Sequence, residues 1–140
     1  MNCGIIAIMS NNWVKDINKM HKKYGVHKWM EHNPGLRRDY LNFRINFINE
    51  ELNELRQAEL NRNNEEVVDA LIDICVVAIG TLDAFDIDAY QAWDEVWNAN
   101  MKKYVGKKAE RPNPMGLPDL AKPDDWVPPS HSGNHGKLPK

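Results

Sequence analysis

The residues of this chain best suited to chemistry are six carboxylates on either side of a polar turn: Glu50, Glu51 and Glu54, and then Glu66, Asp69 and Asp73. Within each group, spacings of three or four residues place the acids on a common face of a helix. Like charges held this close repel one another unless cations lie between them. The two groups are therefore a candidate cation-binding site.

The surroundings of Asp69 and Asp73 strengthen this interpretation. The run from Val67 to Ile79 is otherwise apolar on nearly every side, which is typical of a buried helix. It contains no lysine, arginine or histidine that could pair with the two acids. Burying an unpaired carboxylate is costly, so we expect a cation to offset their charge.

Carboxylate oxygens are the hard ligands that Mg²⁺ prefers, with Mn²⁺ a possible substitute. Two antiparallel helices joined by the turn Asn61–Asn64 would bring the two groups together. The first group alone also fits a solvated helix face, and Asp69 and Asp73 could be partly exposed on a helix flank. The presence of both groups at this separation favours the metal site.

Hydrophobic periodicity predicts an all-α chain of four helices packed as a bundle. The first begins after Asn12 and carries Trp13, Ile17, Met20 and Tyr24, and the break at residues 31–35 follows it. The second runs from about Leu36 to Leu60. The third is capped by Asn64 and ends near Phe85, and the fourth is capped by Asp88 and carries Trp93, Val96, Trp97 and Met101. No segment shows the alternation of a strand.

The composition changes after Gly106, because seven of the eight prolines follow it. We therefore expect an extension over residues 1–12, one helical domain over 13–105 and an extended tail over 106–140. A net charge of −2 argues against a nucleic-acid binder. The run Ile5–Met9 is too short for a membrane span and lacks the basic start of a signal peptide, and Cys3 and Cys75 form no disulfide framework, so we expect a cytoplasmic protein.

The aromatic and histidine residues have two interpretations each. His21 and Trp126 could frame a nucleotide base, but packing explains His21 equally well. Packing is the better explanation for Trp13 and Tyr24. The remaining histidines lack ligand spacing around a common helix face, so a histidine metal site is not expected, apart from adventitious binding by the tail: His27, His32, His131 and His135.

Five segments also form recognisable motifs: Ile17-x-x-Met20-His21-x-x-Tyr24-Gly25; Glu50-Glu51-x-x-Glu54; Asp69-Ala70-Leu71-Ile72-Asp73 with Gly80-Thr81 and Ile87-Asp88; Glu95-Val96-x-x-x-Asn100-Met101-x-Lys103; and Lys122-Pro123-x-x-Trp126-x-Pro128-Pro129. In this order they resemble the MazG-like and phosphoribosyl-ATP-pyrophosphohydrolase-like superfamily of all-α NTP pyrophosphatases, in particular its phage-type members. The superfamily's mark is EExxE followed by ExxD. Here Asp73 stands where that aspartate is expected and Ala70 replaces the glutamate, so either Asp69 or Glu66 completes the acidic set.

The resemblance implies a homo-oligomer, at least a dimer, that hydrolyses an NTP or dNTP to the monophosphate and pyrophosphate. Its Mg²⁺ would be held by Glu51, Glu54 and Asp73 together with Asp69 or Glu66, and Glu51 or Glu54 would accept the proton of the attacking water. Asn100 and Lys103, one turn apart, would contact phosphate or ribose, with His21 and Trp126 as further substrate contacts. Neither nucleic acid nor a membrane is an expected partner. The alternative is a non-catalytic helical scaffold of the same fold.

Overall fold

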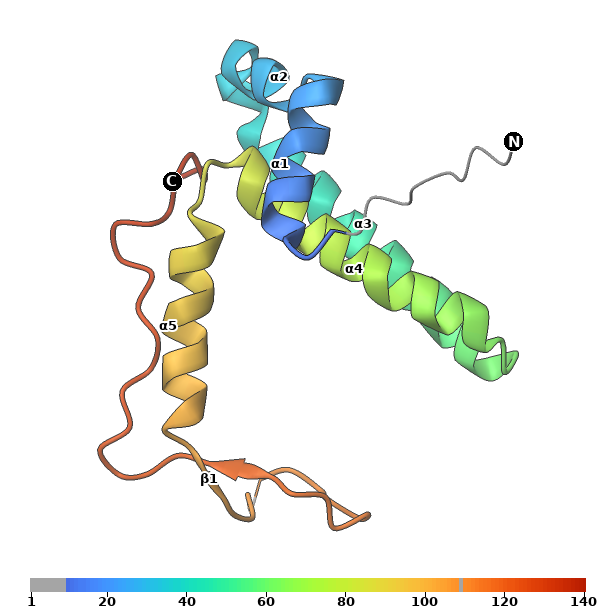
Figure 1. The fold of residues 1–140 in the computed structure, drawn as a ribbon, viewed down its shortest axis with the longest axis vertical. Helices are drawn as coiled ribbons and strands as arrows, with labels where there is room; N and C mark the ends of the chain where they lie inside the picture. The colour runs from blue at the N-terminus through green and yellow to red at the C-terminus, as the bar shows by residue number, and fades with distance from the viewer. Residues whose placement is uncertain (1–9, 109) are drawn as a thin grey trace, which may run out of the picture. The chain divides into compact units, whose positions relative to one another are not determined.

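The computed structural model describes residues 10–108 and 110–140, in which helices dominate (Figure 1). The run Ile5–Met9 and Cys3 lie outside the described residues. The elements follow one another as α1 (Trp13–Tyr24), α2 (Val26–His32), the 3₁₀ turn η1 (Pro34–Leu36), α3 (Arg37–Leu60), α4 (Asn64–Ala84), α5 (Ala89–Met101), β1 (Tyr104–Val105) and β2 (Leu120–Ala121). The predicted all-α class is confirmed.

The helix boundaries follow local capping chemistry. Asn12 caps α1 by accepting a hydrogen bond from the backbone N–H of Lys15 at 3.0 Å. Gly25 ends α1 in the left-handed conformation, with φ of 75°, and so lets the chain turn directly into α2. This short helix is not among the four expected, so the described residues form five. The cap of α4 is Asn63 rather than Asn64, because the Asn63 side chain accepts from the Glu66 N–H at 3.2 Å.

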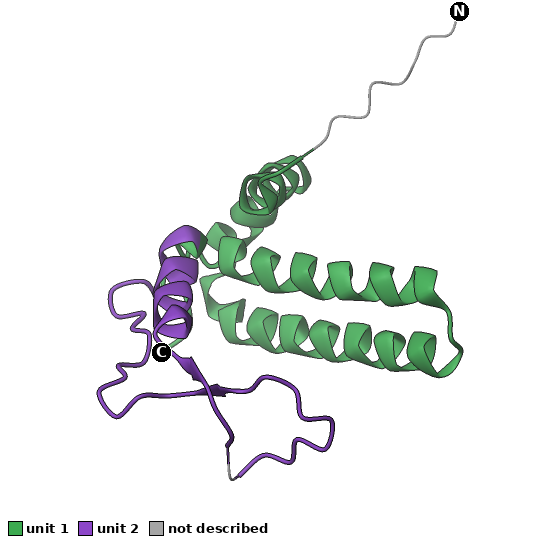
Figure 2. Cartoon of the chain, turned by 60° about the horizontal axis from the view of Figure 1, so that its bottom comes forward, with its two compact units in different colours: residues 1–89, 136–140 green, residues 90–135 purple. Residues whose placement is uncertain are grey.

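The chain forms two compact units, residues 1–89 with 136–140 and residues 90–135 (Figure 2). The first unit is built on a long antiparallel hairpin of α3 and α4, with α1 packed on α4. Small side chains allow the hairpin helices to approach: Ala58 on α3 and Ala70, Val77 and Gly80 on α4 are all buried. Among the described residues, none of the helices combines the length and apolar character of a transmembrane span.

The first unit has its best-packed core where α2, α3 and the end of α4 meet. Met30, Ala84 and Phe85 are buried there, and the Tyr40 ring packs edge-on against Phe85 with centroids 5.7 Å apart. Leu138 joins this core from the C-terminal segment. The backbone N–H of Lys137 also donates to the Phe85 carbonyl at 2.7 Å. Residues 136–140 therefore pack with the helices of unit 1, although the sequence suggests a continuous tail from Gly106.

The second unit contains α5 beyond Ala89 and most of the proline-rich segment. Tyr104 pairs with Ala121 and Val105 with Leu120 in a two-residue antiparallel ladder, a minimal strand pair that the sequence pattern did not indicate. The segment then runs back along α5 (Figure 1), where the Trp126 indole N–H donates to the Ala99 carbonyl at 2.7 Å. The compact units thus divide the chain at other places than the predicted boundaries at 12 and 105.

Candidate active site

Glu51 is the most unusual carboxylate of the hairpin. It lies on α3 and is buried, with 7% of its surface exposed. Its Oε2 atom is inaccessible and has no hydrogen-bond partner among the described residues. Burial is the main cause that raises the pKa of Glu51 above its ordinary value, and the charges of Glu54, Asp73, Asp69 and Glu50 raise it further. The Oε2 atom of this carboxylate is therefore buried without a donor from the residues that the structure describes.

The hairpin explains why these acids meet. Glu51 and Asp73 are equally far along the chain from Arg62, which takes a left-handed conformation with φ of 52° in the tight turn between the helices. Antiparallel packing through such a turn brings the two residues to the same level, with Glu54 and Asp69 one turn nearer its tip. Asp73 is half-buried, whereas Glu54 and Asp69 are exposed. The two acidic groups expected to converge are thus brought together on one hairpin.

Glu66 occupies a different position from the other acids. It is exposed in the first turn of α4, where its backbone N–H is bound by the Asn63 cap. At 1.5 Å per residue it lies about 10 Å along the helix from Asp73. It is also absent from the charges that raise the pKa of Glu51. Between the two candidates left open by the sequence, Asp69 is the one placed beside Glu51.

The donor set of the hairpin fits a hard cation. It offers carboxylate oxygens only, and one of them, Oε2 of Glu51, is buried and has no hydrogen-bond partner among the described residues. The neighbouring acids raise the pKa of Glu51, and a divalent cation would relieve this repulsion. Glu51 is buried and Asp73 is half-buried, and the exposed Glu54 and Asp69 side chains have room to rotate toward them. These four residues could therefore hold Mg²⁺ or Mn²⁺.

A second group of predicted residues comes together in unit 2. The Lys103 ammonium donates to the Asn100 side-chain oxygen at 2.8 Å and lies 5.3 Å from the centre of the Trp126 ring. The Lys122 ammonium lies over the same ring, at 4.5 Å. Trp126 is distant in sequence from Asn100 and Lys103, yet the three residues form one cluster of cation, amide and aromatic ring. Such a cluster offers a point charge for phosphate and an aromatic face for a base.

His21 is placed in the interior of unit 1. It is 5% exposed, and its Nδ1 lies 2.8 Å from Asp83 Oδ2. Burial is the main cause that lowers the pKa of His21, only partly opposed by the hydrogen bond to Asp83. Arg44 is close by, bound to Thr81 Oγ1 at 3.1 Å and to the Val77 carbonyl at 3.0 Å. Gly80 makes room for both, because a Cβ there would lie 2.7 Å from the Arg44 guanidinium and 3.2 Å from the His21 ring.

His27 and Asp83 belong to the same network and were missed by sequence reasoning. Among residues 10–108 and 110–140, one group of three possible ligands has its ligand atoms within 4.8 Å of one another, and it consists of His21, His27 and Asp83. Asp83 is 62 residues from His21, so no local motif links them. The signal that was available is the pair His21 and His27 on either side of the helix-ending Gly25.

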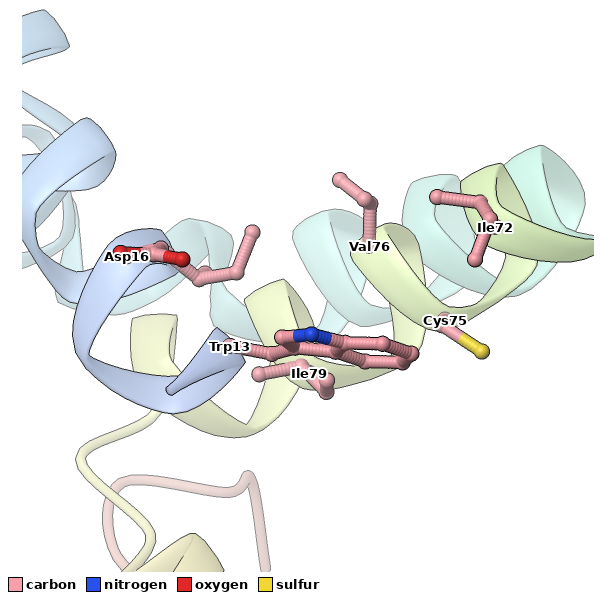
Figure 3. A pocket seen from close by; sticks show the side chains of 7 residues that line it. Trp13, Asp16, Ile72, Cys75, Val76 and Ile79 are labelled. Carbon is pink, nitrogen blue, oxygen red and sulfur yellow. The ribbon is translucent and has the colours of Figure 1, made fainter. Parts of the chain in front are cut away.

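A shallow apolar hollow of about 190 Å³ opens between α1 and α4. In Figure 3 the Trp13 indole lies along α4 beside Ile79 and reaches toward Cys75, with Asp16 as the acidic residue at the α1 side. Trp13 remains 53% exposed and Ile72 45% exposed. The lining of the hollow has no cluster of polar groups that would orient a nucleotide. The hollow therefore marks a face of α4 that α1 covers incompletely.

The fold and the acidic hairpin define a class of protein: an all-α chain with opposed carboxylates on two antiparallel helices. A family model described as phosphoribosyl-ATP pyrophosphohydrolase matches residues 27–100, which is 74 of the 140 residues and includes α3, α4 and the four clustered acids. The chain belongs to this family, and the resemblance to the MazG-like and phosphoribosyl-ATP-pyrophosphohydrolase-like superfamily is confirmed. Comparisons with curated proteins and with solved structures find no match. Family membership indicates a hydrolase of the nucleotide pyrophosphohydrolase type.

Proposed function

We propose that this protein is a Mg²⁺-dependent nucleotide pyrophosphohydrolase that converts an NTP or dNTP to the (d)NMP and pyrophosphate. The observation that carries the proposal is the buried, unpartnered Oε2 of Glu51 among four further acids of the hairpin. A purely structural carboxylate in that position would be expected to have a donor. Family membership supplies the reaction class, and the acidic hairpin supplies a place for the cation.

Glu51, Glu54, Asp69 and Asp73 would hold the cation. When bound, Mg²⁺ neutralises phosphate charge and activates water for attack on phosphorus. Glu51 or Glu54 would take the proton of the attacking water.

The substrate contacts are proposed from the cluster in unit 2. The Lys103 ammonium would bind a phosphate oxygen, and the Asn100 amide would help to position the Lys103 side chain or a ribose hydroxyl. The Trp126 ring, held by its hydrogen bond to Ala99, would stack on a base. His21 is a weaker candidate for direct contact because it is buried and bonded to Asp83.

The test is a substrate screen with all common NTPs and dNTPs and with phosphoribosyl-ATP, the compound in the family's name, in Mg²⁺ or Mn²⁺. Orthophosphate is measured with and without added inorganic pyrophosphatase, and nucleotide products are separated by chromatography. We expect a phosphate signal that requires the pyrophosphatase, together with the monophosphate. Release of orthophosphate and a diphosphate would contradict this cleavage. The absence of turnover with every substrate would support the non-catalytic scaffold instead.

A further inference from the structure

Three side chains from three helices meet at the end of unit 1 that is distant from the hairpin turn. They are His21 on α1, His27 on α2 and Asp83 on α4. One oxygen of Asp83, Oδ2, lies 2.8 Å from His21 Nδ1 and 2.9 Å from His27 Nε2. The planes of the two imidazole rings are inclined at 67°, with centroids 6.2 Å apart. One carboxylate oxygen is thus shared by two ring nitrogens.

Hydrogen bonding does not account for the His27 side of this arrangement. His27 Nε2 is inaccessible to solvent and forms no hydrogen bond of acceptable geometry, although it is close to the Asp83 oxygen. The nitrogen is therefore positioned beside the carboxylate without the alignment that a donated N–H would give. A cation that lies between the two rings and the carboxylate would use this nitrogen, which is otherwise unsatisfied.

The neighbouring groups orient the three side chains. The Asn18 amide donates to the other oxygen of Asp83 at 2.8 Å, so that Oδ2 faces the two rings. The second nitrogen of His27 lies 3.6 Å from Asp86 Oδ1. A carboxylate behind a ligating histidine is a common arrangement around protein metals, because it fixes the ring and makes it a better ligand. Asn18 thus orients Asp83, whereas Asp86 lies near His27 at a distance longer than a hydrogen bond.

The protonation of the cluster also suits a cation. Burial lowers the pKa of His21, which keeps this imidazole neutral and able to donate a lone pair at neutral pH. Asp83 and Asp86 contribute two negative charges, and Lys137 neutralises part of that charge through its 2.6 Å ion pair with Asp86. The Arg44 guanidinium donates to Thr81 and Val77, and its charge also helps to lower the pKa of His21, so the cation would be held by its ligands rather than by net negative charge.

We propose that His21, His27 and Asp83 form a second metal site, which binds one borderline divalent cation of the Zn²⁺ type and ties α1, α2 and α4 together. Two imidazole nitrogens and one carboxylate oxygen suit Zn²⁺ or Co²⁺ better than Mg²⁺. In a tetrahedral site with bonds near 2.0–2.1 Å, ligand atoms are about 3.3 Å apart, so the distances from Asp83 Oδ2 to the two ring nitrogens need to widen by only about half an ångström. Asp83 is about 15 Å along α4 from Asp73, which makes this site separate from the acidic hairpin.

The test uses the full chain, freed of metal with a chelator and then titrated with Zn²⁺ by calorimetry and with Co²⁺ by visible absorption. We expect one equivalent of Co²⁺ to give the intense bands of a tetrahedral site, apart from any ion that the acidic hairpin binds, and the wild type to melt at a higher temperature with Zn²⁺. His27→Gln should weaken this binding by at least about tenfold. His32→Gln is the matched control, because His32 lies on the same helix but is exposed. It should bind as the wild type does.

Two further variants separate other sources of binding. Asp73→Asn tests the acidic hairpin, and the double variant His131→Gln with His135→Gln tests adventitious binding by the tail; both should retain the Co²⁺ bands. The proposal is wrong if His27→Gln binds like the wild type, or if either of these variants abolishes the bands. If His27→Gln loses helical content, imidazole NMR signals of the intact protein decide instead. Zn²⁺ must then shift two of the five histidines, and no shift overturns the proposal.

Discussion

Glu51 on α3 and Asp73 on α4 lie at the same level of the hairpin, and the charge of Asp73 contributes to the raised pKa of Glu51. The two residues destabilise each other as anions, and within residues 10–108 and 110–140 neither of them forms an ion pair with a basic side chain. An arrangement of this kind is unfavourable for folding alone and favourable for holding a cation. It therefore makes activity and stability respond in opposite directions to the same substitution.

The first prediction follows from this opposition. Glu51→Gln, Glu54→Gln and Asp73→Asn should each lower the rate of pyrophosphate release by about 10²–10⁴-fold, as expected when a metal ligand or general base is removed. The melting temperature of the metal-free variants should stay the same or rise, because one repulsive charge is gone. Mg²⁺ should stabilise the wild type by mass action and stabilise the variants much less.

Glu59→Gln provides the matched control. Glu59 is an exposed acid on the same helix and is not among the charges that act on Glu51. This variant should retain wild-type turnover and the full Mg²⁺ effect on melting. Wild-type turnover in Asp73→Asn, or unfolding of that variant with no dependence on metal, would remove the basis for the proposed site.

The second prediction concerns pH. Because the pKa of Glu51 is raised above its ordinary value of 4.5, the folded protein binds this proton more readily than the unfolded chain does. The free energy of unfolding of the metal-free wild type should therefore rise as the pH falls through the folded-state pKa of Glu51 toward 4.5. This gain in stability should be lost again as the pH rises. Glu51→Gln lacks this contribution. Melting curves of both proteins in chelator should differ most at neutral pH and converge in acid, and parallel curves would contradict the assignment.

The sequence predicted the helical hairpin and its acids because both depend on local information. Helical periodicity fixes which face each acid occupies, and the turn at Asn61–Asn63 fixes how the faces meet. His21, His27 and Asp83 could not be found in this way, because their contact depends on how α1 packs on α4. Leu138 shows the same limit, since a proline-rich context masks a side chain that reaches the core.

The third prediction concerns the cluster in unit 2. Lys103→Ala should raise KM for the nucleotide by about tenfold and leave the melting temperature nearly unchanged, because it removes a charge that would contact phosphate. Lys122→Ala is a stringent control, since both ammonium groups lie over the Trp126 ring but only Lys103 is bonded to Asn100. Equal effects of the two substitutions on KM would mean that Lys103 acts only by packing on Trp126.

The fourth prediction is self-association through α4. This helix leaves large apolar side chains exposed, with Val68 at 62% and Leu71 at 48%. Covering them with a second copy would remove apolar surface from water. Light scattering at micromolar concentration should give at least a dimer, and Val68→Glu with Leu71→Glu should shift it to monomer. Met115→Glu, at an exposed apolar residue of the tail, should not change the mass. An active monomeric wild type would exclude this interface.

The fifth prediction tests how the C-terminal segment contributes to unit 1. Gly136 has a φ of 50°, and a Cβ at this position would lie 2.0 Å from the Phe85 carbonyl oxygen. Gly136→Ala must therefore push the segment away, with loss of the Lys137 hydrogen bond to Phe85, its ion pair with Asp86 and the packing of Leu138 on the core. We expect a melting temperature lower by about 3–8 °C, as for a loss of 1–2 kcal/mol in a chain of this size.

Gly133→Ala separates this collision from backbone strain. Gly133 also has a positive φ, of 77°, but nothing lies within 4 Å of the position its Cβ would take. Alanine there has the intrinsic cost of the left-handed conformation, about 1–2 kcal/mol, and no collision. Its effect should be confined to the loop, with the helical melting transition nearly unchanged, whereas Leu138→Ala should lower that transition as Gly136→Ala does. Equal shifts for the two glycine variants would show that strain alone is responsible and that the segment adds little to the stability of the helices.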